Sequence, residues 1–302
     1  MKKRRNMSSE SSQKRYATIM LLPALIFLAT LIAFPLVRVL HDAFTYVHLI
    51  NKNMSGFAGL ANFQKVVSDE HFWQACRNTV YWTVFSVLGE YIMGLLTAVL
   101  LNRKFKGRAI FRTFVFIPWL VPIVVAGMTW DWLLNADFGI INHILLSTGL
   151  ISQKINFLGD ARFAMPTVIF VNIWRSFPYY TISLLAALQA IPGDLPEAAA
   201  VDGAGIFRTF FSVTLPQLRS VSLVVIFIHI ISTAINFDFI WVMTEGGPNY
   251  ATETLPIMIY RYSMRTFNVG AASALSTMML TVMVILFIFY YRKRTQISAD
   301  MN

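Results

Sequence analysis

The sequence has few charged residues for its length. Only 13% of its 302 residues are Asp, Glu, Lys or Arg, whereas 56% are hydrophobic, and the mean hydropathy is +0.59. A chain of this size needs more charge to cover a water-soluble surface. The composition therefore excludes an ordinary soluble globular protein and predicts a membrane protein.

Cysteine is nearly absent. Cys76 is the only one, which excludes an intrachain disulfide and leaves redox chemistry without a second thiol. The sequence also has no G-x-x-x-x-G-K-[ST], H-E-x-x-H or G-x-S-x-G, and its five histidines share no metal-ligand spacing. We therefore expect no catalytic residues, no metal and no cofactor bound by this chain, and we do not expect it to be an enzyme.

Acidic residues are outnumbered by basic ones, 15 against 25, which gives a net charge of +10. Single-stranded nucleic acid would require basic and aromatic residues interleaved on a polar surface, and the chain has no such stretch. We therefore expect no nucleic-acid partner. In a membrane protein, an excess of Lys and Arg is explained first by the positive-inside bias.

Apolar runs of about 20 residues, the length that crosses the hydrocarbon core, occur six times. The first is longer than a signal-peptide core and no small-x-small cleavage site follows it, so we interpret it as a retained anchor. The sequence predicts an all-α, polytopic membrane protein with a membrane domain at 17–292 between tails at 1–16 and 293–302. The six predicted transmembrane helices are 17–40, 79–101, 113–130, 163–188, 221–243 and 271–291.

The distribution of Lys and Arg predicts the orientation. Sixteen lie in the N-terminal tail, in 103–112, in 208–219 and after Tyr291, whereas seven lie in the alternate connecting segments. Both termini and the segment 189–219 are therefore expected in the cytoplasm, which is an N-in, C-in topology.

The segment 189–219 is polar and lies between two apolar runs. Pro192 and Gly193 are expected to end the fourth span, and Asp194 with Glu197 has the spacing of a capping box that starts a new helix. Gly203 interrupts this helix, and a second one is expected from the recurrence of Phe207, Phe210, Phe211 and Leu215. The segment is predicted to be a helix-turn-helix element; by periodicity alone, it could equally be a hairpin that covers the ends of its own spans.

The residue order in this element resembles the EAA loop found in permease subunits of bacterial ATP-binding-cassette importers. The residues that carry the resemblance are Glu197, Ala198, Ala199, Gly203, Val213, Leu215 and Pro216. Blocks at 59–83, 102–122, 173–192 and 237–255 are similar to the carbohydrate-uptake branch, specifically the maltose-transporter type of first permease subunit. Two positions depart from that pattern, because Val213 stands where Ile is commoner and Ser220 where proline is common.

The resemblance implies a type I ABC importer permease fold in a bacterial inner membrane, with the loop acting as a coupling helix. It assigns polar docking contacts to Glu197 and Asp202, the turn to Gly203, and close approach to Ala198, Ala199 and Ala200. The implied partners are a second homologous permease, two ATPase subunits that hydrolyse the ATP, and an extracytoplasmic solute-binding protein. The implied activity is uptake of an oligosaccharide or monosaccharide.

Polar residues within the spans are candidates for the substrate pathway, because such groups are costly in lipid and usually face a cavity or a polar partner. The candidates are Glu90, Asn172, Trp174, Arg175, Asn236 and Asp238. The alternative is structural: Glu90 and Arg175 form a salt bridge between helices, or Arg175 extends to the outer interface.

Three other functions fit part of the sequence. Glycerol-3-phosphate uptake by the same machinery would use Arg175 for an anion. A stand-alone secondary carrier would need an inverted repeat with matching broken spans, which the two halves of the chain do not show. A membrane-bound assembly or receptor subunit would use the loop for docking but would leave Arg175 and Asp238 without a role.

Overall fold

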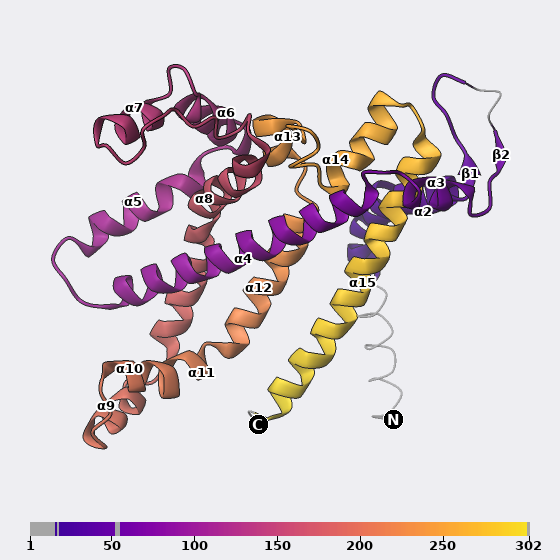
Figure 1. Ribbon diagram of the computed structural model, residues 1–302. Coiled ribbons are helices and arrows are strands. Elements are labelled where there is room, and N and C mark those ends of the chain that lie inside the picture. Colours follow the sequence, from indigo (N-terminus) through magenta and orange to yellow (C-terminus); the bar gives the residue numbers. More distant parts are fainter. Residues whose placement is uncertain (1–15, 17, 52–54, 301–302) are drawn as a thin grey trace, which may run out of the picture. The chain divides into compact units, whose positions relative to one another are not determined.

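The computed structural model describes Tyr16, residues 18–51 and residues 55–300, apart from the side chains of 297–300. The predicted basic tail at 1–16 therefore lies almost wholly outside the described residues. Helices make up nearly all the regular structure in the described part (Figure 1). The two strands there, β1 (Thr45–Tyr46) and β2 (Gly56–Phe57), pair antiparallel with Thr45 opposite Phe57.

The chain forms two compact units. The first comprises residues up to Val67 together with Arg261–Met278. It contains the apolar helical stretch Thr18–Ala43, which includes the π-helical turn η1 (Ala29–Ala33) and α2 (Phe34–Ala43), then the two strands, α3 (Ala61–Val67), the π-helical turn η3 (Arg261–Arg265) and the start of α15 (Val269–Asp300).

The side chain of Asn62 organises the first unit. Its amide nitrogen donates hydrogen bonds to the carbonyl oxygens of Ala43 and Thr45, at 3.0 and 2.9 Å. Gly270 packs beside it so closely that a β-carbon at this position would lie 2.7 Å from the Thr45 carbonyl oxygen. The N-terminal part of α15 is thus held against the strand that follows α2.

The second unit comprises Ser68–Tyr260 and the rest of α15. Its long helices are α4 (Phe72–Asn102) and α8 (Ala161–Ala190). The other elements are α5 (Arg108–Leu120), α6 (Ile123–Leu134), α7 (Ile140–Ser147), α9 (Asp194–Val201), α10 (Ile206–Thr209), the π-helical turn η2 (Phe210–Thr214), α11 (Leu215–Gln217), α12 (Arg219–Ala234), α13 (Asp238–Thr244) and α14 (Leu255–Tyr260).

Helices α4 and α8 pack closely because small residues of α4 face α8. A β-carbon at Gly94 would lie 2.3 Å from Cβ of Tyr180, and one at Gly89 would lie 2.3 Å from the side chain of Ile173. Helix pairs in membranes use small residues in this way, because lipid supplies no hydrophobic force between helices and backbone approach increases dispersion contacts.

In the described part of the chain, three helices are individually long and apolar enough to cross a membrane: Thr18–Ala43, Phe72–Asn102 and Val269–Gln296. Two bent pairs, Arg108–Leu120 with Ile123–Leu134 and Ile206–Gln217 with Arg219–Ala234, raise the number to five among the described residues if each pair is one span. Helix α8 contains the predicted fourth span and is about 45 Å long at 1.5 Å per residue, but it is not among these candidates.

The predicted third span, 113–130, is not one straight helix. Helix α5 ends at Leu120, and α6 begins after Pro122 at an angle of 95° to it. Val121, which precedes the proline, is extended, because the proline ring disfavours helical geometry in the preceding residue.

Helix α8 begins at a well-formed cap. Oδ1 of Asp160 accepts a hydrogen bond from the backbone nitrogen of Arg162 at 2.9 Å, and its Oδ2 lies 2.7 Å from the Arg162 guanidinium. The hydrogen bond from the Arg162 side chain, followed by the one from the Arg162 backbone, lowers the pKa of Asp160 to about 2. The carboxylate therefore remains ionised, and it also interacts favourably with the helix dipole.

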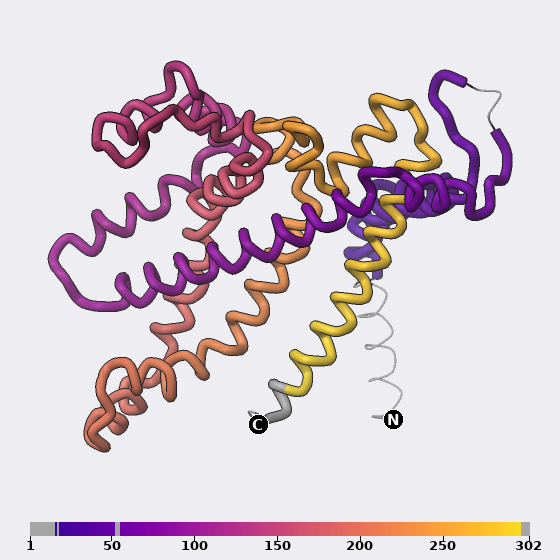
Figure 2. Tube along the Cα trace, in the orientation of Figure 1, coloured from indigo at the N-terminus to yellow at the C-terminus, as the bar shows by residue number. Residues whose placement is uncertain are grey.

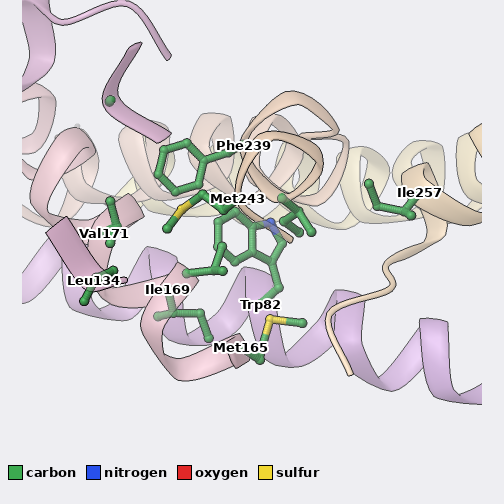
Figure 3. Packing of buried hydrophobic residues seen from close by; sticks show 11 residues of the cluster. Trp82, Leu134, Met165, Ile169, Val171, Phe239, Met243 and Ile257 are labelled. Carbon is green, nitrogen blue, oxygen red and sulfur yellow. The ribbon is translucent and has the colours of Figure 1, made fainter. Parts of the chain in front are cut away.

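A hydrophobic core in the second unit surrounds Trp82 of α4 (Figure 3). Phe239 and Met243 of α13 and Ile169 of α8 pack around the indole. The indole nitrogen donates a hydrogen bond to the carbonyl oxygen of Thr233 at 2.9 Å, so this buried polar group is satisfied.

A second core contains Tyr180, Leu184 and Leu188 of α8 together with Leu218 and Val225. Because Leu218 immediately precedes α12, this core fixes the start of α12 against the end of α8. The intervening loop leaves α8 and returns to α12 at this point (Figure 2).

Candidate functional site

The segment between α8 and α12 forms the predicted helix-turn-helix element. Helix α9 ends in a Schellman motif, in which the Ala204 nitrogen donates to the Ala199 carbonyl at 2.9 Å and the Gly203 nitrogen donates to the Ala200 carbonyl at 3.1 Å. Gly203 has φ of +78°, a conformation that costs residues with a β-carbon about 1–2 kcal/mol. The prediction that Gly203 makes the turn is confirmed.

The start of α9 differs from the predicted capping box. Gly193 is the N-cap, no side chain caps the helix, and Asp194 and Glu197 both lie inside the first turn. The chain leaves α8 through Pro192 only one residue before the cap, so Asp194 falls within the helix instead of before it. Both carboxylates still lie near the positive end of the helix dipole, and Pro196 lies in the first turn as predicted.

Most residues of the loop that the resemblance assigns to docking are exposed. Glu197, Ala198, Asp202 and Gly203 are exposed and Ala199 is half-buried. Large apolar side chains on both sides of the turn are open to the surroundings: Val201 before it is 89% exposed and Phe207 after it is 81% exposed. Such a group of apolar side chains on a polar loop is typical of a protein-binding surface.

The opposite side of the loop faces its own spans. Phe210, which the periodicity predicted to share one ridge with Phe207, is half-buried and instead lines a hollow of about 350 Å³. Asn102 and Arg103 at the end of α4 and Leu188 of α8 line the same hollow. The π-helical turn η2 begins at Phe210, so it changes the helical register of the residues that follow, including Leu215 and Pro216.

A buried polar group joins α4, α8 and α12. Glu90 is completely buried; Asn172 Nδ2 donates to its Oε1 at 2.8 Å, and Nδ1 of His229 lies 2.8 Å from its Oε2. The rings of Tyr179 and Tyr180 lie against the imidazole, with centroid separations of 4.7 and 4.5 Å. One carboxylate thus ties three helices of the second unit together.

Arg175 lies one turn from Asn172 on α8. It is near enough for its charge to attract Glu90, but the described residues include no ion pair between them, and the buried Nε of Arg175 has no hydrogen-bond partner there. The alternative of a Glu90–Arg175 salt bridge is therefore wrong in this structure. His229 is the basic group that contacts the carboxylate.

The remaining pathway candidates lie outside this hydrogen-bonded group. Trp174 is half-buried and packs edge to face on Trp130, with a centroid separation of 5.3 Å. Asn236 accepts a hydrogen bond from the Phe239 nitrogen at 3.1 Å, and Asp238 is exposed in the first turn of α13. The predicted fifth span, 221–243, is broken between Ala234 and Asp238, and these two polar residues mark the break.

His229 was not among the predicted site residues, although it is the one titratable side chain in the apolar run 221–235. A polar group at such a position needs a buried partner, and this requirement is the signal that could have linked it to Glu90. Tyr91 and Ser222, whose hydroxyl groups share a hydrogen bond of 2.9 Å between α4 and α12, were missed as well.

These features define a helical membrane protein with an exposed helix-turn-helix loop between two spans. Residues 90–294 match the family model described as binding-protein-dependent transport system inner membrane component. The chain belongs to this family, whose members are permease subunits of ATP-binding-cassette transporters, as the loop residues predicted.

Named relatives cover most of the chain. It is 37% identical to the trehalose/maltose transport system permease protein MalF of Thermococcus litoralis, over 81% of each chain. It is 32% identical to the sulfoquinovosyl glycerol transport system permease protein SmoG of Agrobacterium fabrum, over 91% of this chain and 89% of that one. It is also 32% identical to the sn-glycerol-3-phosphate transport system permease protein UgpA of the same organism, over 79% and 80%.

The fold is shared with a solved structure. A chain of a bacterial ABC transporter involved in the import of the acidic polysaccharide alginate superposes with a TM-score of 0.84, covering 97% of this chain and 99% of that one at 24% identity. The protein therefore has the fold of an ABC importer permease.

Proposed function

We propose that this chain is a permease subunit of an ATP-binding-cassette importer that takes up a carbohydrate. The observation that carries the proposal is the exposed loop 189–219, in which the EAA residue order coincides with a helix that ends in a Schellman turn. Two named relatives, one for trehalose or maltose and one for sulfoquinovosyl glycerol, support the carbohydrate class.

Coupling to ATP hydrolysis is assigned to the outer side of the loop. Helix α9 offers Glu197 and Asp202 for polar contacts, and its alanines allow close approach to a partner cleft. Phe207 supplies apolar contact area beyond the turn. Leu218, at the end of the loop, packs in one core with Leu188 of α8, so movement imposed by an ATPase on the loop is transmitted to the spans.

We also propose that the chain crosses the membrane six times, with both termini in the cytoplasm. Five come from the three apolar helices and the two bent pairs, and α8 supplies the sixth. The chain is then a multi-pass protein of the bacterial inner membrane. It works with a second homologous permease, two ATPase subunits that bind and hydrolyse the ATP, and an extracytoplasmic solute-binding protein. A related structure described as a complex with an alginate pentasaccharide-bound periplasmic protein supports the last partner.

The substrate pathway is proposed to pass α8 near Trp174 and Arg175. An aromatic face stacks on sugar rings, and a guanidinium group donates hydrogen bonds to hydroxyl or anionic groups. Asn236 and Asp238, at the break between α12 and α13, are the other proposed contacts. Glu90 and Asn172 are proposed to support this pathway without contacting substrate, because their polar groups bind each other and so join α4 to α8.

Glycerol-3-phosphate is a second candidate substrate. The half-buried Arg175, whose Nε lacks a partner among the described residues, favours an anionic group, and the relative named UgpA supports this choice. Competition for uptake between a labelled neutral disaccharide and glycerol-3-phosphate distinguishes the two.

Purification of the tagged chain from its native membrane in mild detergent tests the proposal. An ATP-binding-cassette ATPase and a second permease are expected to remain bound. Replacing Phe207 and Phe211 with serine should release the ATPase, whereas Phe289→Ser, at a similarly exposed position of α15, should not. Recovery of only copies of this chain, together with uptake driven by an ion gradient, would favour a stand-alone carrier.

A further inference from the structure

A strongly basic surface lies at the turn between α4 and α5. It consists of Arg103, Lys104, Lys106, Arg108 and Arg112, and we call it the basic turn. No Asp or Glu occurs between Glu90 and Asp131, so the chain itself supplies no neutralising charge along this part of the sequence. Five positive charges within ten residues therefore act together.

The folded structure does not neutralise these charges either. Arg103, Lys104 and Lys106 are exposed. In the part of the chain that the structure describes, none of the five forms an ion pair. The buried Nε of Arg112 has no hydrogen-bond partner there. The turn thus keeps its full charge and its donor capacity for something outside the chain.

Apolar side chains flank the charges. Phe105 packs edge to face on Phe111, with a centroid separation of 6.3 Å, and both are exposed, as is Phe114 one turn further along α5. Basic residues beside exposed aromatic residues match the two layers of a lipid surface, in which anionic headgroups lie next to acyl chains. A protein partner of acidic character would satisfy the charges but would leave these aromatic side chains without an apolar environment.

We propose that the basic turn binds anionic phospholipid headgroups, with their phosphates on Arg103, Lys104 and Lys106 and their acyl chains against Phe111 and Phe114. The proposal goes beyond transport and rests only on the predicted position of this turn at the cytoplasmic membrane surface. Arg103 also lines the hollow under the coupling loop. A bound lipid would therefore lie beside the element that moves during transport.

The test uses the full chain reconstituted in nanodiscs that contain phosphatidylcholine and phosphatidylglycerol. After brief detergent extraction, the ratio of phosphatidylglycerol to phosphatidylcholine retained by the protein is measured by mass spectrometry. Each basic residue near an anionic surface changes affinity about fivefold, and three are removed together. The variant R103Q/K104Q/K106Q should therefore lower the retained ratio at least tenfold.

Two controls identify the cause of any loss. The charge-preserving variant R103K/K104R/K106R should keep the ratio near that of the unmodified chain. The variant R292Q/K293Q/R294Q removes the same charge from an exposed part of α15 and should change the ratio less than twofold. An equal loss in both glutamine variants would overturn the proposal in favour of a general attraction between the chain and anionic lipid.

A protein occupant is tested on the purified complex. If R103Q/K104Q/K106Q releases an ATPase subunit while the retained lipid ratio is unchanged, the basic turn is a protein contact and the lipid proposal is wrong. Lipid retention is measured on the chain alone, so it does not depend on the transport activity. A failure of the proposed function would appear instead in the co-purification of partners.

Discussion

At the scale of single residues, burial of the Glu90 carboxyl group is costly unless its oxygens have hydrogen-bond partners. Removing a carboxyl group from water costs several kcal/mol, which is offset only when partners satisfy its oxygens. Asn172 and His229 supply those partners from two other helices. We infer that this group keeps α12, which continues directly from the coupling loop, attached to α4 and α8.

Replacing His229 with leucine should destabilise the protein by about 3 kcal/mol, because one carboxylate oxygen is left buried without a partner. The double variant E90L/H229L should recover part of this loss, since the buried carboxylate and its His229 partner are removed together and only the Asn172 amide is left without its partner. Thermal unfolding in detergent measures the two effects. Equal stabilities of the single and double variants would contradict a direct interaction and would indicate that His229 only fills space.

Arg175 is expected to act on substrate and not on stability. Arg175→Met removes a half-buried guanidinium and should raise the substrate concentration for half-maximal uptake about tenfold, the effect of losing one charged hydrogen bond. The rate of ATP hydrolysis without substrate should not change. Arg162→Met, which removes an exposed guanidinium paired with Asp160, is the control. An unchanged uptake curve for the Arg175 variant would exclude it from the pathway.

At the scale of elements, the turn in the loop 189–219 depends on one residue with a left-handed backbone conformation, Gly203. Gly203 and Gly205 are both open, since a β-carbon at either position meets nothing within 4 Å. Only Gly203 has a positive φ; Gly205 has φ of −68° as the N-cap of α10. Substitutions at the two glycines therefore distinguish an effect of backbone conformation from an effect of side-chain size.

Gly203→Asp should reduce uptake at least fivefold while the chain still inserts in the membrane, because the Schellman turn is strained. Gly205→Asp adds the same charge two residues away and should stay within about twofold, since Asp is a good N-cap. Transport assays with matched amounts of protein in the membrane compare them. Equal losses would mean that added charge, not backbone conformation, disrupts coupling.

At the scale of the whole molecule, the number of crossings and their direction are open to a direct test. Cys76 is the only cysteine, so a Cys76→Ser background allows single cysteines to be introduced at Lys104, Asp202 and Lys154. Membrane-impermeant thiol reagents added outside should label the Lys154 position only. Labelling of the Asp202 position from outside would contradict the proposed orientation of the coupling loop.

Local features were predictable where one residue decides the backbone. The turn at Gly203 follows from a conformational preference that needs no tertiary contact. The break at Pro122 was not predicted, because Pro118, Pro166 and Pro178 lie inside helices and a proline alone does not decide where a helix ends. The cap of α9 was not predictable to one residue, because it depends on how the chain leaves α8. The half-burial of Phe210 was also missed, because it depends on which side chains of the loop face the ends of α4 and α8.

The sequence by itself determined the membrane class, most of the apolar spans and the EAA residue order of the loop 189–219. These properties depend on composition, run length and residue order, which are local quantities. Only the tertiary structure decided that His229, and not Arg175, contacts Glu90, because that choice depends on which residues of three distant helices meet. It also decided that the fifth predicted span is broken at Asn236, since the packing of α13 around Trp82 redirects the chain there.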